Sequence, residues 1–311
     1  MNKLIRIIFC SVIVAVIVFL GGMTTTIHAS VKNNTKDVEA LNKIIKAQKR
    51  RGAEISTNIY YKKQYKWDKK TGRLTELIWN RRKIKGKLDL SGLKALKKVY
   101  LNGNNITKIR FGRLKNLDDV SINNNKLKTI NVSKLKKLKH FGCSKNSLRK
   151  LNLNHNINLK TLGCDHNKLK RLNLKNTKKL VLLNCEYNQL ETLDTSNCDM
   201  YRGISCQHNR LKTIKLRHKS QLGFFYCHNN QLTELNLDGI LCIEEIMCFN
   251  NQIECLNFTR MDQYFFYSLI CDKNVKIIGR DERIKIESMQ TKKNRIIYEF
   301  DTPDFEPLPE K

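Results

Sequence analysis

The chain has 311 residues, and its 59 basic and 28 acidic side chains give a formal net charge of +31. Such an excess of positive charge favours attraction to polyanions. The eleven cysteines include no C-x-x-C pair, which excludes the common zinc-ligand spacing. No G-x-S-x-G, H-E-x-x-H or phosphate-loop motif is present. We therefore expect neither an enzyme nor a bound cofactor.

Residues 1–29 have the pattern of a secretory signal peptide. Lys3 and Arg6 supply the charged start, residues 7–20 are apolar, and Ala29 ends a small-residue cleavage site. An uncleaved anchor helix is the alternative, although the apolar run is short for a membrane span of roughly 20 residues. The pattern predicts a secreted, cell-surface or wall-associated protein, which contacts a membrane only if this segment is uncleaved.

Residues 36–51 are expected to form an amphipathic helix, because their apolar side chains share one face and Gly52 ends the pattern. Trp67 and the sequence G-R-L-T at 72–75 follow. An open end of a stacked array exposes apolar core and a sheet edge. We therefore assign residues 30–73 to an N-terminal helical cap.

Residues 96–276 repeat a pattern close to L-x-x-L-x-C-x-x-N-x-L. Self-similarity at such a short period fixes the architecture. The asparagine recurs every 21 residues, with a last step of 23, at Asn104, Asn125, Asn146, Asn167, Asn188, Asn209, Asn230, Asn251 and Asn274. An earlier, degenerate turn begins at Leu74 and has Arg82 where asparagine is expected.

Each repeat predicts one short strand. In the unit 159–180, Leu162 and Cys164 alternate with Gly163 and Asp165, which is the period of a half-buried strand. One turn cannot bury its apolar edge alone, whereas stacked turns form a continuous core and a parallel sheet. The asparagine amide at each strand exit can bond backbone groups that no strand satisfies.

This spacing resembles leucine-rich repeats, in particular the short bacterial repeats of secreted and surface proteins of the internalin-like class. The G-R-L-T stretch likewise resembles the caps that precede many such arrays. The resemblance implies an α/β-type solenoid: a right-handed superhelix with a parallel concave β-sheet and a short, irregular convex side. The solenoid is expected over 74–279. The resemblance also implies protein–protein recognition on the concave face.

Cysteine occupies the inward strand position in seven turns, at Cys143, Cys164, Cys185, Cys206, Cys227, Cys248 and Cys271. Adjacent strands lie about 4.8 Å apart, whereas a disulfide needs converging Cβ atoms about 3.8 Å apart. We expect buried free thiols here, with a disulfide ladder or a metal site as the alternatives.

The period fails after Asn274. Two short strands are expected at 283–289 and 295–301, as a closing hairpin. The three prolines of the chain lie at 303–309 in an acidic tail. We assign 280–311 to a C-terminal strand cap and tail.

Positive charge is concentrated in the N-terminal half. Residues 30–190 carry 41 basic and 10 acidic side chains, whereas 191–311 carry 16 and 18. Basic residues recur shortly after the asparagine, at Lys108, Lys128, Arg149, Lys150, Lys170 and Arg171. They predict a stripe that binds anionic polymers such as teichoic acid or a glycosaminoglycan. The alternative is a merely solvated surface. Nucleic acid is less expected, because no nucleic-acid motif is present.

The outward strand positions become apolar in the late turns, at Phe224, Tyr226, His228, Met247, Phe249 and Ile270. Clustered aromatic side chains predict a contact site for a protein partner, unless the C-terminal hairpin covers them. The outward residues of earlier strands are small, which indicates a face without such a contact there. Examples are Ser205, Gly163 and Gly142.

Metal and catalytic sites are not expected on this face. His208 and His228 are predicted to approach ligand distance, but no third and fourth ligands are evident. Asp165 and Glu186 are neighbouring acids, yet hydrolysis by paired carboxylates needs a substrate cleft. The sequence therefore favours a binding module that recognises a protein through its concave face. The alternative is a wall-associated protein held by its basic half to an anionic polymer.

Overall fold

The computed structural model describes residues 34–200, 202–217, 221–238, 240–259, 268–278, 286–292 and 295–300. The predicted signal segment 1–29 and the acidic tail lie outside these ranges. Within them, α1 (Thr35–Lys49) is the only helix. It is also too short and too polar to cross a membrane.

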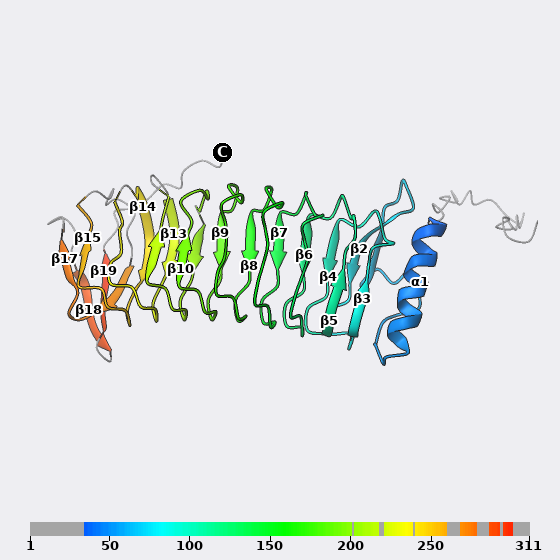
Figure 1. Ribbon diagram of the computed structural model, residues 1–311, viewed down its shortest axis with the longest axis horizontal. Helices are drawn as coiled ribbons and strands as arrows, with labels where there is room; N and C mark the ends of the chain where they lie inside the picture. The colour runs from blue at the N-terminus through cyan, green and yellow to red at the C-terminus, as the bar shows by residue number, and fades with distance from the viewer. Residues whose placement is uncertain are drawn as a thin grey trace, which may run out of the picture. The chain divides into compact units, whose positions relative to one another are not determined.

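The repeats form one large sheet, in which thirteen strands are described (Figure 1). In spatial order the strands are β1 (Tyr65–Trp67), β2 (Leu74–Ile78), β4 (Lys98–Tyr100), β6 (Asp119–Ser121), β7 (His140–Gly142), β8 (Thr161–Gly163), β9 (Leu182–Asn184), β11 (Gly203–Ser205), β13 (Gln221–Tyr226), β14 (Cys242–Met247), β16 (Ser268–Asp272), β19 (Arg295–Phe300) and β18 (Ile286–Lys292). Neighbours from β2 to β16 are parallel, as the repeat predicts.

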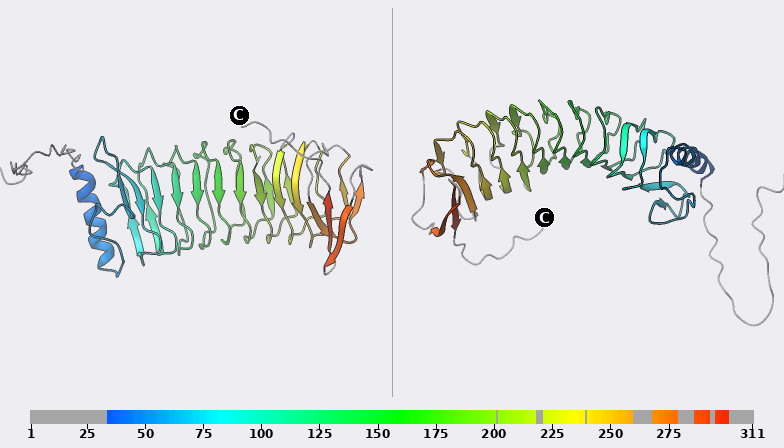
Figure 2. Two further views of the ribbon diagram at one scale, coloured as in Figure 1. Left: turned by 180° about the vertical axis from the view of Figure 1, so that it is seen from behind. Right: turned by 90° about the horizontal axis from the view of Figure 1, so that it is seen from below.

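The register follows the sequence period. His140 pairs with Thr161 and Phe141 with Leu162, each 21 residues on. The segments that return between strands carry no helix in the described ranges, but they form three two-stranded parallel sheets. These pair β3 (Lys85–Asp89) with β5 (Asn105–Arg110), β10 (Thr192–Asp194) with β12 (Thr213–Lys215), and β15 (Cys255–Asn257) with β17 (Lys276–Ile278). The large sheet lines the inner side of the curve that strands β4–β14 follow (Figure 2).

Helix α1 covers the first turn, as the cap prediction requires. The buried Asp37 carboxylate accepts two bonds from the Arg73 guanidinium, at 2.7 and 2.9 Å, and one from the Leu74 backbone N–H at 3.0 Å. The Gln48 amide donates to Lys87 O at 3.1 Å and accepts from Lys85 N–H at 3.3 Å. The cap thus satisfies backbone groups at the edge of β3, which would otherwise be left open.

The asparagine at each strand exit joins two turns. The Asn167 amide donates to the carbonyls of Cys143, Cys164 and Asp165, each at 3.1 Å, and accepts from Leu148 N–H at 2.9 Å. The same pattern recurs from Asn104 to Asn251. We call these eight residues the asparagine column.

Asn274 does not belong to this column, which corrects the expectation from the sequence. It is exposed, in the turn after β16. The reason is the longer last step, since two additional residues move the amide away from the core. Asp272 instead accepts from the backbone N–H groups of Asn250 and Asn251, at 3.0 and 3.3 Å.

The inward cysteines are buried and free, as expected, and all nine cysteines whose side chains are described lack a disulfide. Burial raises the pKa of the Cys164 thiol far above its ordinary value, and it raises the pKa of Cys271 to about 12. The thiols therefore act as small apolar side chains in the core. We call the seven inward residues the thiol column.

Candidate functional site

The outward face of the large sheet contains a hollow of about 580 Å³ across seven strands from β4 to β13. Gly142 and Gly163 lie at its centre, where glycine leaves the sheet surface without side chains. A Cβ atom added at Gly163 would meet Ser144 Oγ at 3.2 Å, and one at Gly142 would meet the Asn123 amide at 3.0 Å. We call this depression the sheet hollow.

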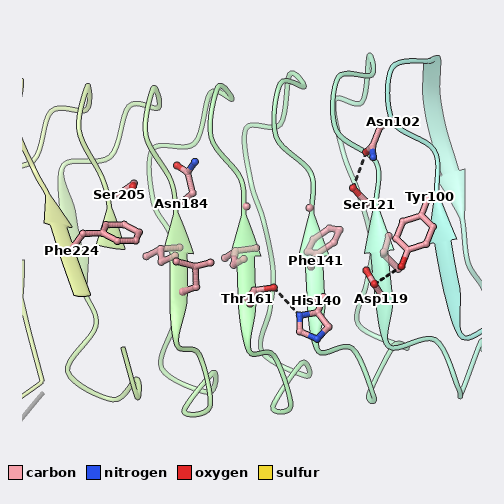
Figure 3. Close-up of a pocket in the computed structure, with 16 residues that line it drawn as sticks. Tyr100, Asn102, Asp119, Ser121, His140, Phe141, Thr161, Asn184, Ser205 and Phe224 are labelled. Carbon is pink, nitrogen blue, oxygen red and sulfur yellow. Dashed lines mark hydrogen bonds between the residues drawn. The ribbon is translucent and has the colours of Figure 1, made fainter. Parts of the chain in front are cut away.

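The sheet hollow is lined by polar and apolar side chains and has an aromatic ring at each end (Figure 3). At one end Tyr100 donates its hydroxyl to Asp119 at 2.7 Å, and desolvation together with this carboxylate raises the tyrosine pKa. Beside it, Ser121 donates to Asn102 at 2.8 Å. Phe224 lies at the other end. The hollow can therefore receive a projecting group that presents both apolar and hydrogen-bonding atoms.

Phe224 links the hollow to the aromatic patch predicted from the sequence. Its ring packs on Gly203 of the neighbouring strand, where an added Cβ would lie 2.7 Å from the ring. It stacks on Tyr226 with ring centroids 4.9 Å apart. Tyr226 donates its hydroxyl to Glu245, and desolvation with this bond raises its pKa to about 12. Both rings are half-buried, as are His228, Met247 and Ile270.

Phe249 is placed differently from the prediction. Only 7% of it is exposed, because it is packed into the fold and its ring stacks on His228 at 4.4 Å. It therefore cannot serve as an exposed contact residue. The predicted hairpin exists as β18 and β19, and β19 pairs antiparallel with β16. Its backbone thus extends the edge of the sheet.

Rings stack at the strand exits: the sequence places His166, His208 and His228 near one another, but it does not predict Tyr187 between two of them. His166, Tyr187 and His208 each precede a column asparagine, and their φ angles are +49°, +49° and +54°. Tyr187 stacks between the two imidazoles, with centroids 4.3 and 4.1 Å apart, and the edge of one ring of the His208–His228 pair meets the face of the other. The left-handed backbone disfavours such residues. The position varies in residue type, so no sequence period reveals it.

Asp165, His166 and Glu186 bring their possible metal-ligand atoms within 4.8 Å of one another. His166 was not expected to join these acids. Asp165 already bonds Ser144 Oγ and lies 3.0 Å from His166 Nδ1. Glu186 accepts a bond from the Gln207 amide. The three side chains are therefore engaged with neighbouring groups, and we assign them no ligand. The rings of His208 and His228 lie 5.6 Å apart, edge to face.

A second depression, of about 880 Å³, lies on the flank of the repeats after the strand exits. It contains four of the six residues of the predicted basic stripe, and its lining is Arg149, Lys150, Leu151, Asn152, Asn154, Lys168, Lys170, Arg171, Asn173 and Gln189. We call it the basic groove. Lys108 and Lys128 are exposed on earlier turns and do not line it.

Parallel strands in 21-residue register and a buried asparagine column define a leucine-rich repeat solenoid, and solved structures agree on this fold. YopM, a leucine-rich effector protein from Yersinia pestis, is 22% identical, with 80% of this chain and 64% of YopM covered and a TM-score of 0.50. The LRIM1/APL1C complex gives 19% identity, 65% and 41% coverage and a TM-score of 0.52.

The functional domain of InlJ from Listeria monocytogenes, which includes a cysteine ladder, is 22% identical over 66% of this chain and 54% of that one. Its TM-score is 0.45, so we conclude nothing from it. The chain spans less than two thirds of the length of each of these three structures. No protein-family model and no curated protein matches the chain.

Proposed function

We propose that the protein is a non-enzymatic binding module that recognises a protein partner through the outward face of its large sheet. This proposal rests on the shape and lining of the sheet hollow. Its glycines leave space above the sheet, and the rings of Tyr100 and Phe224 form the two ends of that space. Interface centres commonly combine such aromatic anchors with a pocket. The LRIM1/APL1C structure, a complex, supports the use of this fold in protein assembly.

The partner is expected to insert a convex segment into the hollow. Asn184, Ser205 and Thr161 supply hydrogen-bonding groups along its walls, and the half-buried Tyr226 extends the contact beyond Phe224. The lining includes Asp119 as its one acidic residue and no lysine or arginine. Shape and hydrogen bonds, rather than long-range charge, are therefore expected to select the partner.

Filling the hollow tests the proposal. A Cβ atom at position 163 needs Ser144 Oγ to move only a few tenths of an ångström. In a Gly163→Trp variant, the indole is expected to occupy the space above β8. We expect at least a tenfold loss of partner affinity, measured by calorimetry, with a small change in Tm. The partner is first identified as a protein that the wild type captures and this variant does not.

Ile157→Trp is the matched control, because Ile157 is 57% exposed and lies outside the hollow. It adds the same ring and should capture the same proteins as the wild type. Equal capture by all three proteins would contradict recognition through the hollow.

We further propose that the protein acts outside the cytoplasm. The charged start, apolar run and Ala29 site of residues 1–29 support this. A reporter enzyme that is active only after export should become active when fused behind residues 1–40. Replacing Val12 and Val14 with Asp should abolish that activity, since it interrupts the apolar run. Retention of the unmodified fusion in the cytoplasm would disprove export by this segment.

A further inference from the structure

We infer that the basic groove binds a linear phosphodiester polymer, at a site separate from the sheet hollow. The inference rests on the charge and the donor groups of the groove, and it does not depend on the proposed protein partner. The two depressions share no lining residue.

The charge of the groove has one sign. Five of its ten lining residues are lysine or arginine, all exposed, and none is acidic. They come from two successive turns: Arg149 stands 21 residues before Lys170, and Lys150 stands 21 before Arg171. One turn later Glu191 takes the position of Lys170. Positive charge is thus concentrated in the groove and interrupted at one end.

The neutral side chains of the groove also favour an acceptor-rich ligand. Asn152 Oδ1 accepts from Asn154 N–H, and Asn173 Oδ1 accepts from Lys175 N–H, both at 3.0 Å. One acceptor site of each amide oxygen is therefore already used, while both N–H donors of each Nδ2 are available to a ligand. Together with five cationic side chains, the groove offers donors to oxygen atoms that can only accept.

Backbone bonds between the turns hold the groove in shape. Lys168 N–H donates to Leu148 O at 2.8 Å, and Gln189 N–H donates to Leu169 O at 2.9 Å. The asparagine column fixes the adjacent backbone as well, since Leu148 N–H donates to Asn167 Oδ1. The backbone of this preformed groove therefore loses little conformational entropy on binding.

A phosphodiester is well matched to these groups. Each guanidinium can donate two parallel bonds to the two free oxygens of one phosphate. Successive turns about 4.8 Å apart then present a series of charges to a chain with repeated phosphates. Single-stranded nucleic acid usually adds stacking of bases on aromatic rings. No aromatic residue lines the groove, so we infer a polymer whose phosphates are joined by small groups without bases.

Poly(glycerol phosphate) is the probe that tests this inference, measured by calorimetry with the mature protein between 50 and 300 mM salt (about the range in which counterion release is resolved). Wild-type protein should bind it more tightly than heparin or a single-stranded oligonucleotide of equal charge. Changing Lys150, Lys170 and Arg171 together to Glu should weaken binding at least tenfold. It should also reduce the slope of log affinity against log salt by roughly 2–3, because three phosphate contacts are lost.

The matched control changes three lysines to Glu on the loops behind the sheet. These are Lys134, Lys136 and Lys178, which are exposed and lie outside the groove. Both variants change the net charge equally, and the control should bind nearly as the wild type does. If both variants bind the polymer equally weakly, binding depends on the overall positive charge and not on the basic groove. Tighter binding of heparin or of the oligonucleotide would overturn the choice of a phosphodiester polymer. Capture of a protein partner should survive the groove variant, which separates this test from that of the hollow.

Discussion

At the scale of single residues, the asparagine column connects sequence to stability most directly. Each amide satisfies backbone groups of two turns, and Asn167 makes four such bonds while only 8% of it is exposed. Asparagine suits the position because one amide both donates and accepts. Water cannot easily replace these bonds at a buried site.

An Asn167→Ala variant should therefore lower the free energy of unfolding by about 1–3 kcal/mol, the usual cost of leaving buried backbone groups unpaired. Urea denaturation measures the change. Asn116→Ala removes an exposed amide of the same kind and should stay within about 0.5 kcal/mol of wild type. Similar losses in the two variants would show that burial of the column amide is not what matters.

At the scale of strands and helices, regular repetition decided what could be predicted. The helix expected at 36–51 is α1 at Thr35–Lys49, and both strands of the expected hairpin are present. The inward cysteines were correctly placed because an alternating pattern leaves one choice of face. The two-stranded sheets on the returning segments were not predicted, since their residues show no such alternation.

The candidate sites were less accessible from the sequence. In the sequence, Gly142 and Gly163 indicate an unused face, yet glycine is what creates the sheet hollow. A depression forms only where larger side chains surround the glycines in space. Tyr100, at one end of the hollow, lies 42 residues before Gly142 in the chain, so local sequence does not show that they are neighbours. Phe249 was expected at the surface, but alternation alone cannot show that a neighbouring ring packs over it.

At the scale of the whole molecule, function is proposed to divide between two surfaces of one array of paired strands. The sheet hollow has little charge, whereas the basic groove has five cations and no acid among its lining residues. We expect shape to select the ligand at the sheet hollow and electrostatics to select it at the basic groove. Partner binding in the hollow should therefore resist salt, while polymer binding should not.

Because of the thiol column, the stability of the protein should decrease with rising pH in the alkaline range. Below a pH of about 7, both folded and unfolded thiols keep their protons, and the full stability is present. Above the ordinary thiol pKa of about 8.5, the unfolded chain releases protons that the buried thiols retain. The free energy of unfolding must then fall as pH rises, until the pH reaches the raised pKa of the folded thiols, about 12 for Cys271.

Each buried thiol contributes a loss of about 1.4 kcal/mol per pH unit in this window, so seven of them acting together should unfold the array abruptly in mild alkali. Denaturation midpoints measured from pH 7 to 10 check this. A variant with Cys164 and Cys185 changed to Ala removes two of the seven titrating groups and should show a shallower decline with pH, even if it is less stable at pH 7. A decline of unchanged steepness would mean that other groups control the alkaline limit. On this account, a column of side chains that never meets solvent in the folded protein sets the highest pH at which the protein can stay folded.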